Sequence, residues 1–406
     1  MTQDRQVNRR RFLQTASAAT GLLLVQPGVA FGYQANEKLR LGVIGCGGRG
    51  SWIGYLFQEN TNTQVVALHD YFQEQADNAQ QKMGLKEVRK YIGLDGYKEM
   101  LADGGLDAIA VESPPYFHPE QAVAGLEAGV HVYLAKPIAV DVPGCMAIVD
   151  AAEKNKDKLT CLVDFQTRNN EFYRGVAQRI HDGEIGFPVC GQAYYHASRL
   201  NIQMPPGTEV ARLRNWVFDI TLSGDIIVEQ NIHVLDVANW YLQGHPVEAT
   251  GTGGRRVRTD VGDCWDHYVV TYRYPNDVLI DFASTQFTTG YDALCTRLFG
   301  STGSVESFYG GDVWLKNREG GWEGGNTAKI YTEGAVNNMK DFHKSIVEGK
   351  PYNNALESAH STMTSILGRT AARAQGKVTW DEMVAANVKL DPRLDLPADG
   401  PLVKRG

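Results

Sequence analysis

Apolar and polar positions follow two different patterns along this chain. From about residue 38, short apolar runs typical of buried strands take turns with segments of helical periodicity. This alternation predicts a series of βαβ units, and hence a parallel sheet covered by helices on both faces. The expected strands lie at 39–47, 64–70, 106–115, 131–137 and 159–166, and the expected helices at 51–60, 73–84, 119–129 and 143–155.

The pattern changes after about residue 165. Apart from helices expected at 172–183 and 232–244, the next segments are strand-like runs separated by Gly, Pro and Asn turns. Such runs, without helices between them, predict a large open sheet that is mainly antiparallel. The runs lie at 189–197, 247–254, 266–274, 278–287 and 296–307, and two last helices are expected at 337–349 and 356–376.

The predicted fold is therefore α/β, with a parallel-sheet domain followed by an α/β domain built on an open sheet. We expect the first domain at 36–165, the second at 166–335, and C-terminal helices with a Pro-rich tail at 336–406.

The N-terminal 30 residues differ from the rest of the chain. Arg9 and Arg10 precede Phe12 and Leu13, and an apolar stretch too short for a stable membrane span ends at Ala30. This order is typical of a twin-arginine export signal, which predicts cleavage after Ala30 and a periplasmic or otherwise exported protein without a stable membrane span. The alternative is a basic amphipathic arm that stays on the mature protein.

Composition narrows the class of partner. The chain has 406 residues, of which 43% are hydrophobic, and its formal net charge is -7. A net negative charge without a long basic run argues against nucleic acid or an anionic membrane surface, so a small molecule is the expected partner. The six cysteines stand singly, without metal-ligand spacing, and we expect buried thiols and no metal site.

A glycine-rich turn lies between the first expected strand and helix. Gly45, Gly47 and Gly50 form a G-x-G-x-x-G motif, whose glycines let backbone N–H groups approach a pyrophosphate at the positive end of a helix. About 20 residues later, Asp70 ends the next strand, where a carboxylate accepts hydrogen bonds from a ribose 2′-hydroxyl. Because Tyr71 and the residues after it carry no cation, NAD is favoured over NADP.

Lys136 interrupts the apolar run "HVYLAKPIAV". Removing an ammonium group from water is costly unless a partner or a reaction compensates for it. The simplest explanation is that its stem lies along the surface and its head reaches water. The alternative is a functional lysine, and the rest of the chain decides between the two.

Four motifs, in their order and spacing, resemble the Gfo/Idh/MocA oxidoreductases, which include glucose-fructose oxidoreductase and inositol dehydrogenase. The motifs are "GVIGCGGRG", "ESPPYFHPE", "HVYLAKP" and "DGEIGFPV", and the resemblance spans about 38–376. It implies a Rossmann domain, a second domain with a large open sheet, and a catalytic lysine beside the nicotinamide at Lys136. It also implies cofactor contacts from the first two motifs, at Arg49, Ser113, Pro114 and His118, although His118 is also compatible with a structural role.

The sequence departs from the family's E-K-P motif at one position. The glutamate expected before the lysine is Ala135. In the family this glutamate helps to hold the cofactor, so cofactor affinity is expected to depend on other contacts here.

An acid and a histidine also follow the family's pattern. Glu229 and His233 have i, i+4 spacing, and Asp236 follows three residues later, which predicts that all three share one helix face. A histidine is suited to take the proton of a hydroxyl being oxidised, and an acidic neighbour can orient its ring. We expect His233 to be the general base, supported by Glu229. A core histidine bonded to a backbone carbonyl is the alternative.

Further candidates for a sugar pocket have weaker signals. Sheet packing or surface ion pairing explains each of them equally well, and no mechanism is assigned to the pair Asp266 and His267. The candidates are Arg168, Asn169, Tyr195, Arg199, Trp216 and Asp236.

Together these features predict an NAD-dependent oxidoreductase that acts on a ring hydroxyl of a sugar or glycoside. Because little free NAD exists outside the cytoplasm, an exported enzyme is expected to hold its cofactor tightly and recycle it internally. A redox-neutral NAD-dependent glycosidase or lyase is the alternative, although "VEQNIH" lacks the tyrosine typical of such relatives. A non-catalytic exported sugar-binding protein is a third possibility. By analogy with the family, a homodimer or homotetramer is expected.

Overall fold

The first half of the molecule is built on a parallel sheet. The computed structural model describes residues 37–401, so the predicted export signal at 1–30 lies outside the described residues. The six strands have the order β3-β2-β1-β4-β5-β6, and every neighbouring pair is parallel. The strands are β1 (Leu39–Ile44), β2 (Thr63–Asp70), β3 (Arg89–Ile92), β4 (Ala108–Val111), β5 (His131–Ala135) and β6 (Cys161–Asp164).

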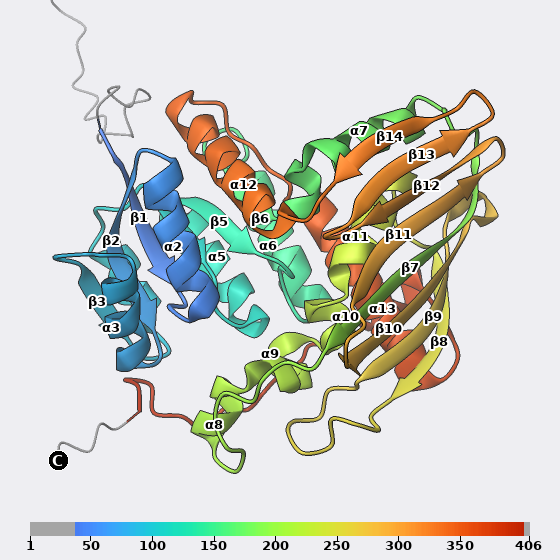
Figure 1. Cartoon of the computed structure of the whole chain (residues 1–406). Helices are drawn as coiled ribbons and strands as arrows, with labels where there is room; N and C mark the ends of the chain where they lie inside the picture. The colour runs from blue at the N-terminus through green and yellow to red at the C-terminus, as the bar shows by residue number, and fades with distance from the viewer. Residues whose placement is uncertain (1–36, 402–406) are drawn as a thin grey trace, which may run out of the picture. The chain divides into compact units, whose positions relative to one another are not determined.

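The helices between these strands follow the predicted alternation. β3 and α4 were not predicted, because the short run "RKYI" is half polar and carries no strand period. Figure 1 shows α2 and α5 beside the first sheet. The helices are α2 (Gly48–Asn60), α3 (Gln73–Lys82), α4 (Gly96–Ala102), α5 (His118–Glu127) and α6 (Val142–Asn155), with a short 3-10 turn η1 (Pro115–Phe117) before α5.

The second sheet has nine strands in the order β14-β13-β12-β11-β7-β10-β9-β8-β15. All its neighbouring strands are antiparallel except β7 and β10, so the mainly antiparallel sheet is confirmed. The run expected at 296–307 contains parts of two strands, which turn at Ser301 and Thr302. The strands are β7 (Pro188–Ser198), β8 (Glu248–Gly254), β9 (His267–Arg273), β10 (Leu279–Thr288), β11 (Ala293–Gly300), β12 (Gly303–Phe308), β13 (Asp312–Asn317), β14 (Trp322–Asn326) and β15 (Lys377–Thr379).

Helices cover one face of this second sheet, where α7, α11 and α13 contact its strands. Along β9, buried residues alternate with exposed or half-buried ones, as expected when the other face is open. α13 also contacts α6, so the C-terminal helices join both sheets and do not form a separate layer. The helices are α7 (Glu171–His181), α8 (Glu209–Arg214), α9 (Ile220–Ser223), α10 (Ile226–Glu229), α11 (Ile232–Leu242), α12 (Ile330–Val347), α13 (Ala355–Ala374) and α14 (Trp380–Ala386), with short 3-10 turns η2 (Gln166–Asn169) and η3 (Trp216–Phe218).

One helix expected from the sequence is two separate helices in the structure. Glu229 was expected to share a helix with His233, but it is the last residue of α10, and α11 begins at Ile232. Gln230 and Asn231 separate the two helices. The spacing of the acid and the histidine therefore does not place them on one continuous helix face.

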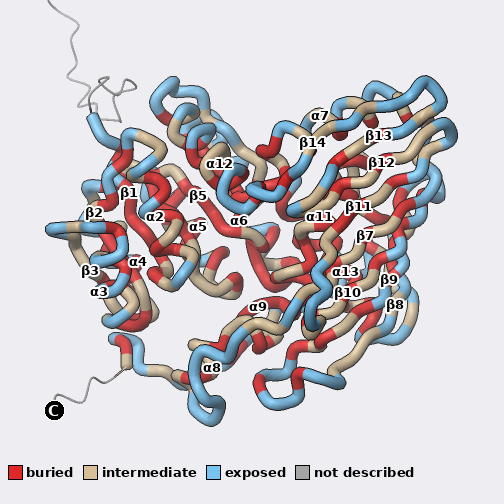
Figure 2. Tube along the Cα trace, in the orientation of Figure 1, coloured by how far each residue is buried: buried red, intermediate tan, exposed pale blue. Residues whose placement is uncertain are grey.

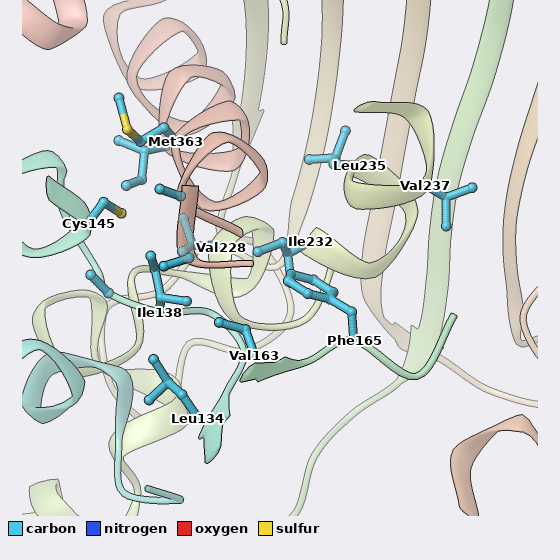
Figure 3. Close-up of a cluster of buried hydrophobic side chains, with 14 of the residues drawn as sticks. Leu134, Ile138, Cys145, Val163, Phe165, Val228, Ile232, Leu235, Val237 and Met363 are labelled. Carbon is cyan, nitrogen blue, oxygen red and sulfur yellow. The ribbon is translucent and has the colours of Figure 1, made fainter. Parts of the chain in front are cut away.

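A continuous apolar core joins the two sheets, and the buried parts of the chain run through both (Figure 2). Figure 3 shows the part of this core that contains Leu134, Ile138, Val228 and Ile232. Leu134 and Ile138, which flank Lys136 and Pro137 in sequence, belong to the same buried cluster as Val228 and Ile232, which flank Glu229. Apolar packing therefore positions the lysine and the glutamate from two different segments.

The cysteines are free, and five of them are buried as expected, but Cys190 is exposed on β7. The prediction of six buried thiols is therefore wrong at Cys190, because this residue lies near the start of a strand whose first residues are half-buried or exposed. Within residues 37–401, no helix is both long and apolar enough for a membrane crossing. The same residues contain no group of three or more His, Cys, Asp or Glu side chains arranged for a metal ion.

Candidate active site

The glycine motif forms a tight turn from β1 into α2. Gly45 has φ +86°, and a Cβ atom there would lie 2.5 Å from the backbone nitrogen of Ser113. A Cβ atom on Gly50 would lie 1.8 Å from the carbonyl oxygen of Gly45. Glycine is therefore required at both positions. The turn leads into the N-terminus of a 13-residue helix, where free N–H groups and the helix dipole favour a pyrophosphate.

An open cavity lies beside this turn. Gly47, Asp70, Ser113 and Pro114 line it, as predicted for a dinucleotide site. It lies where the strand order reverses between β1 and β4, the position at which such sheets bind dinucleotides. These features fit NAD: two positions that require glycine, a helix N-terminus for the pyrophosphate, and a carboxylate at the end of β2 for the ribose.

Trp216 also lines this dinucleotide cavity, together with Leu213 and Arg214. The sequence had suggested Trp216 for a sugar pocket. Its position is different because the segment between β7 and α10 returns to the first sheet, where α9 contacts η1. No local sequence pattern predicts such a return.

Asp70 is held by backbone donors. Its Oδ2 accepts from the Cys46 N–H at 2.7 Å and its Oδ1 from the Phe72 N–H at 2.9 Å. Burial raises the pKa of Asp70, while these two hydrogen bonds and the charge of Arg214 act in the opposite direction. Sequence reasoning missed Arg214, since it is distant from Asp70 along the chain. Arg214 is paired with Glu74.

Lys136 follows β5 and forms a cis peptide bond with Pro137. Its Nζ donates to the backbone oxygen of Glu229 at 2.5 Å and to Oε1 of Glu229 at 3.1 Å. Only 11% of the lysine side chain is exposed, which excludes the simple explanation that its head reaches open water. An ammonium group has three donors, so one remains for a ligand beyond the two bonds found in the described residues.

Glu229 also belongs to a chain of hydrogen bonds that reaches the second sheet. Its Oε2 accepts from Gln230 Nε2 at 2.5 Å, and Gln230 Oε1 accepts from the Tyr195 hydroxyl at 3.1 Å. Tyr195 lies on β7 and is buried. The sequence suggested that Tyr195 lines a sugar pocket. In the structure, Gln230 links Tyr195 by hydrogen bonds to the Lys136–Glu229 pair.

His233 lies close to the same pair. Burial lowers its pKa well below 6.5, and the positive charges of Lys136 and Arg49 lower it further. The ring is therefore neutral near pH 7 and can accept a proton. Its Nδ1 is buried without a hydrogen-bond partner among residues 37–401, and its ring centre lies 5.5 Å from that of Tyr309. We predicted that Glu229 supports His233, but the described residues show no direct hydrogen bond between the two side chains. Oε1 of Glu229 accepts from Lys136, and Oε2 accepts from Gln230.

The replacement of the motif glutamate by Ala135 has a structural explanation. Ala135 pairs with Asp164 across β5 and β6, and Glu112 follows Val111, whose partner is Leu134, so the three form a row. Arg49 forms ion pairs with both Glu112, at 3.1 Å, and Asp164. The small Ala135 side chain leaves room between two carboxylates for one guanidinium group, where a third carboxylate would add an uncompensated buried charge.

Glu112 has an unusual ionisation as a result. Burial raises its pKa to about 7, and Asp164 adds to this rise, while Arg49 and Lys136 act against it. Arg49 does not fully offset the effect of burial, so Glu112 is only partly ionised near pH 7. Sequence reasoning missed Glu112 because only the register of the sheet brings it beside Asp164.

His118 has a structural position. Each ring nitrogen faces a carbonyl oxygen, that of Pro137 at 2.8 Å and that of Ser113 at 2.7 Å, and the single N–H of the neutral ring donates to one of them. It is buried, and burial lowers its pKa to about 4. His118 therefore ties the turn after β4 to the segment that carries Lys136 and does not line the dinucleotide cavity.

The other substrate candidates engage partners other than Lys136, Glu229 and His233. Arg168 pairs with Asp236 at 2.8 Å, so Asp236 engages Arg168 and not the acid and histidine. Asn169 donates to Asn338 and Asp341 on α12. Two more pairs lie on the second domain: Arg199 with Asp260 at 2.6 Å, and His267 with Asp266 at 2.7 Å.

Comparison with known proteins agrees with this arrangement. A model of the Gfo/Idh/MocA oxidoreductase family, NAD-binding Rossmann fold, matches residues 39–163, and a model of the family's C-terminal domain matches residues 173–306. Inositol 2-dehydrogenase from Klebsiella pneumoniae strain 342 is 29% identical over 270 residues, which are 66% of this chain and 73% of that protein. The inositol 2-dehydrogenase of Acidothermus cellulolyticus is 26% identical over 272 residues, again 66% and 73% of the two chains.

Solved structures share the fold. Levoglucosan dehydrogenase, in complex with NADH and levoglucosan, has a TM-score of 0.70 and 19% identity, and covers 84% of this chain and 99% of its own. Myo-inositol 2-dehydrogenase from Lactobacillus plantarum has a TM-score of 0.68 and 19% identity over the same shares. The two family models together match more than half of the chain. The chain therefore belongs to the Gfo/Idh/MocA family of oxidoreductases with an NAD-binding Rossmann domain.

Proposed function

We propose that this protein oxidises a ring hydroxyl of a sugar, cyclitol or glycoside with NAD as the hydride acceptor. The observation that carries the proposal is the group formed by Lys136, Glu229 and His233, whose lysine acts electrostatically on Glu112, a residue that lines the dinucleotide cavity. Lys136 and Glu229 form a largely buried ion pair, and the charges of Lys136 and Arg49 act on a buried, neutral His233.

The residues have separate tasks in this reaction. The remaining Lys136 N–H donates to the substrate oxygen and stabilises negative charge that develops there. His233 takes the hydroxyl proton on its ring as the C=O bond forms. NAD, when bound, accepts the hydride that leaves the carbon. Glu229 holds Lys136 through two hydrogen bonds, which fixes the direction of the third donor.

Relatives support the substrate class. Inositol 2-dehydrogenases are similar over about two thirds of the chain, and levoglucosan dehydrogenase shares the fold. Their names specify a cyclitol and an anhydrosugar, both of which carry ring hydroxyls. This chemistry matches the proton acceptor and oxyanion donor that the site provides.

Export of the protein and retention of its NAD are linked, because little free NAD exists outside the cytoplasm. We propose that the protein is exported by the twin-arginine route, acts outside the cytoplasm, and retains its NAD between turnovers. Paired Arg9 and Arg10 before an apolar stretch support export. We also propose a homodimer or homotetramer that associates through the open face of the second sheet, where Val269 is half exposed.

The test uses purified full chain with a panel of cyclitols, anhydrosugars and aryl glycosides. The expected result is reduction of the nicotinamide, followed by absorbance, with a sugar or cyclitol and not with a simple alcohol. Release of the aryl group without net NADH formation would replace this proposal by the redox-neutral glycosidase. The absence of both signals across the panel would overturn the enzymatic proposal.

A further inference from the structure

One wall of the dinucleotide cavity comes from outside the Rossmann domain. Leu213, Arg214 and Trp216 line the cavity together with Gly45 and Asp70. They belong to α8 and η3, in the long connection between β7 and α10. The cavity is therefore bordered by a segment that the parallel sheet does not supply.

Arg214 is fixed over the pocket by two contacts. Its guanidinium carbon lies 3.6 Å from the ring centre of Phe72, and it forms an ion pair with Glu74. Phe72 and Glu74 follow Asp70, the residue placed for the ribose of the adenosine half. Only 18% of the Arg214 side chain is exposed, so the guanidinium is part of the cavity wall and not a free surface charge.

An apolar cluster holds this segment against the Rossmann domain. Tyr71, Phe72, Leu213 and Leu222 are its buried members. Trp216 packs against them, as do Leu394 and Leu396 from the C-terminal tail. The cluster thus joins the Rossmann domain, the connection between β7 and α10, and the C-terminal tail, which are far apart along the chain.

The tail forms the outer part of the same structure. The carbonyl oxygen of Ala398 accepts from the Leu94 N–H at 2.8 Å, and Leu94 lines the cavity. The carbonyl oxygen of Pro392 accepts from Arg212 at 2.8 Å, which ties the tail to α8. Figure 1 shows this red C-terminal segment passing α8 on its way to the part of the sheet near α3.

We propose that residues 209–222 and 390–400 form a clamp that retains the adenosine half of NAD. Arg214 and Trp216 are its contact residues, and the tail holds them in place. Arg214 presents a flat cation and Trp216 an indole, and both kinds of group stack on the face of an adenine ring. These contacts slow the departure of the adenosine half from the open cavity.

This inference rests on the proposed retention of the cofactor, but not on the sugar chemistry. The clamp provides a physical reason for slow exchange that does not depend on what the enzyme oxidises. A test that contains no sugar therefore distinguishes failure of the clamp from failure of the proposed substrate class.

The experiment measures release of NADH. Full-length protein is loaded with NADH, an excess of NAD is added, and the loss of bound-NADH fluorescence gives the dissociation rate. Arg214→Ala and Trp216→Ala are each expected to accelerate release about tenfold, the size expected from one lost stacking contact. Arg318→Ala, which removes an exposed arginine on the β13–β14 turn, is expected to match the unchanged protein.

ADP-ribose and nicotinamide mononucleotide identify the half of the cofactor involved. Arg214→Ala is expected to weaken ADP-ribose binding by about the same factor as NADH binding, and to leave the mononucleotide affinity unchanged. Arg214→Lys keeps the charge for Glu74 without the planar group, so it is expected to release NADH nearly as fast as Arg214→Ala. Release rates in both Arg214 variants equal to that of Arg318→Ala, or an unchanged ADP-ribose affinity, would overturn the proposal.

Discussion

At the scale of single residues, the central feature is a lysine whose charge is compensated before any ligand binds. The side chains of Lys136 and Glu229 are each about nine-tenths buried. Burying this pair would cost several kcal/mol without the hydrogen bonds from Lys136 to the backbone oxygen and to Oε1 of Glu229. Sequence and family resemblance predicted Lys136, Glu229 and His233. They did not predict Glu112 and Arg214, because strand register and the return of a distant segment bring these residues to the site.

Replacing Lys136 tests its role in the reaction. Lys136→Met is expected to lower kcat/KM by about 10²–10⁴-fold, because the donor to the substrate oxygen is lost while most of the stem volume remains. NADH affinity is expected to change little, since Lys136 does not line the adenosine-side cavity. Steady-state kinetics and NADH titration measure the two effects. Lys158→Met, an exposed lysine, is the matched control, and equal rates in both variants would contradict the assignment.

The lowered pKa of His233 predicts how the free energy of unfolding depends on pH. Its folded-state pKa lies well below 6.5, because the ring is buried and faces Lys136 from the β5 segment and Arg49 from α2. Below about pH 6.5 the unfolded chain therefore binds a proton that the folded chain excludes, and the free energy of unfolding falls as the pH falls.

His233→Asn removes this titration. The difference in unfolding free energy between the unchanged protein and His233→Asn is expected to shrink as the pH is lowered through 6.5. Chemical denaturation at several pH values measures it. A difference that stays constant across this range would show that His233 is not held neutral by the fold.

At the scale of elements, the sequence predicted most of the order of strands and helices. Long apolar runs in β1, β2 and β5 have strong periodicity, whereas β3 and α4 are short and partly polar. The expected single helix around Glu229 is divided at Gln230 and Asn231, where the Asn231 N–H donates to the carbonyl oxygen of Ile226, five residues back, and the regular helical hydrogen bonding stops. Glu229 contacts Lys136 from the last position of α10, which a helical pattern alone does not show.

The turn from β1 into α2 allows a matched pair of substitutions. A Cβ on Gly50 collides with the Gly45 carbonyl, whereas a Cβ on Gly48 meets nothing within 4 Å. Gly50→Ala is therefore expected to distort the turn and weaken NADH binding by about tenfold or more, since the backbone N–H groups lose their direction. Gly48→Ala is expected to bind within about threefold of the unchanged protein. Fluorescence titration tests the pair, and equal affinities would contradict the described turn.

At the scale of the whole molecule, both sheets and the C-terminal tail contribute to one site. Lys136 comes from the first sheet and Glu229 and His233 from the helices beside the second, while α13 contacts both halves. The two-sheet organisation was predictable from the change in periodicity near residue 165. The contacts between the tail and the dinucleotide cavity were not, because residues 390–400 show no regular pattern.

The tail can be tested without removing it. A double substitution of Leu394 and Leu396 by Ala is expected to accelerate NADH release several-fold, because both side chains pack against the cluster that holds Trp216. Both leucines are half-buried, so the loss of unfolding free energy is expected to be only about 1–2 kcal/mol. Release kinetics and denaturation are measured on the same samples. Unchanged release despite the lower stability would restrict the tail to a structural role.

The most direct test of the account examines the full-length protein purified without added nucleotide. The protein is assayed for bound NAD, and its absorbance is recorded before and after addition of sugars and cyclitols. We predict stoichiometric NAD that remains with the protein, is reduced by a ring-hydroxyl substrate, and is reduced about 10²–10⁴-fold more slowly in Lys136→Met. A protein that neither carries nor binds NAD, or a Lys136→Met variant that reduces it at the unchanged rate, would contradict the central claim.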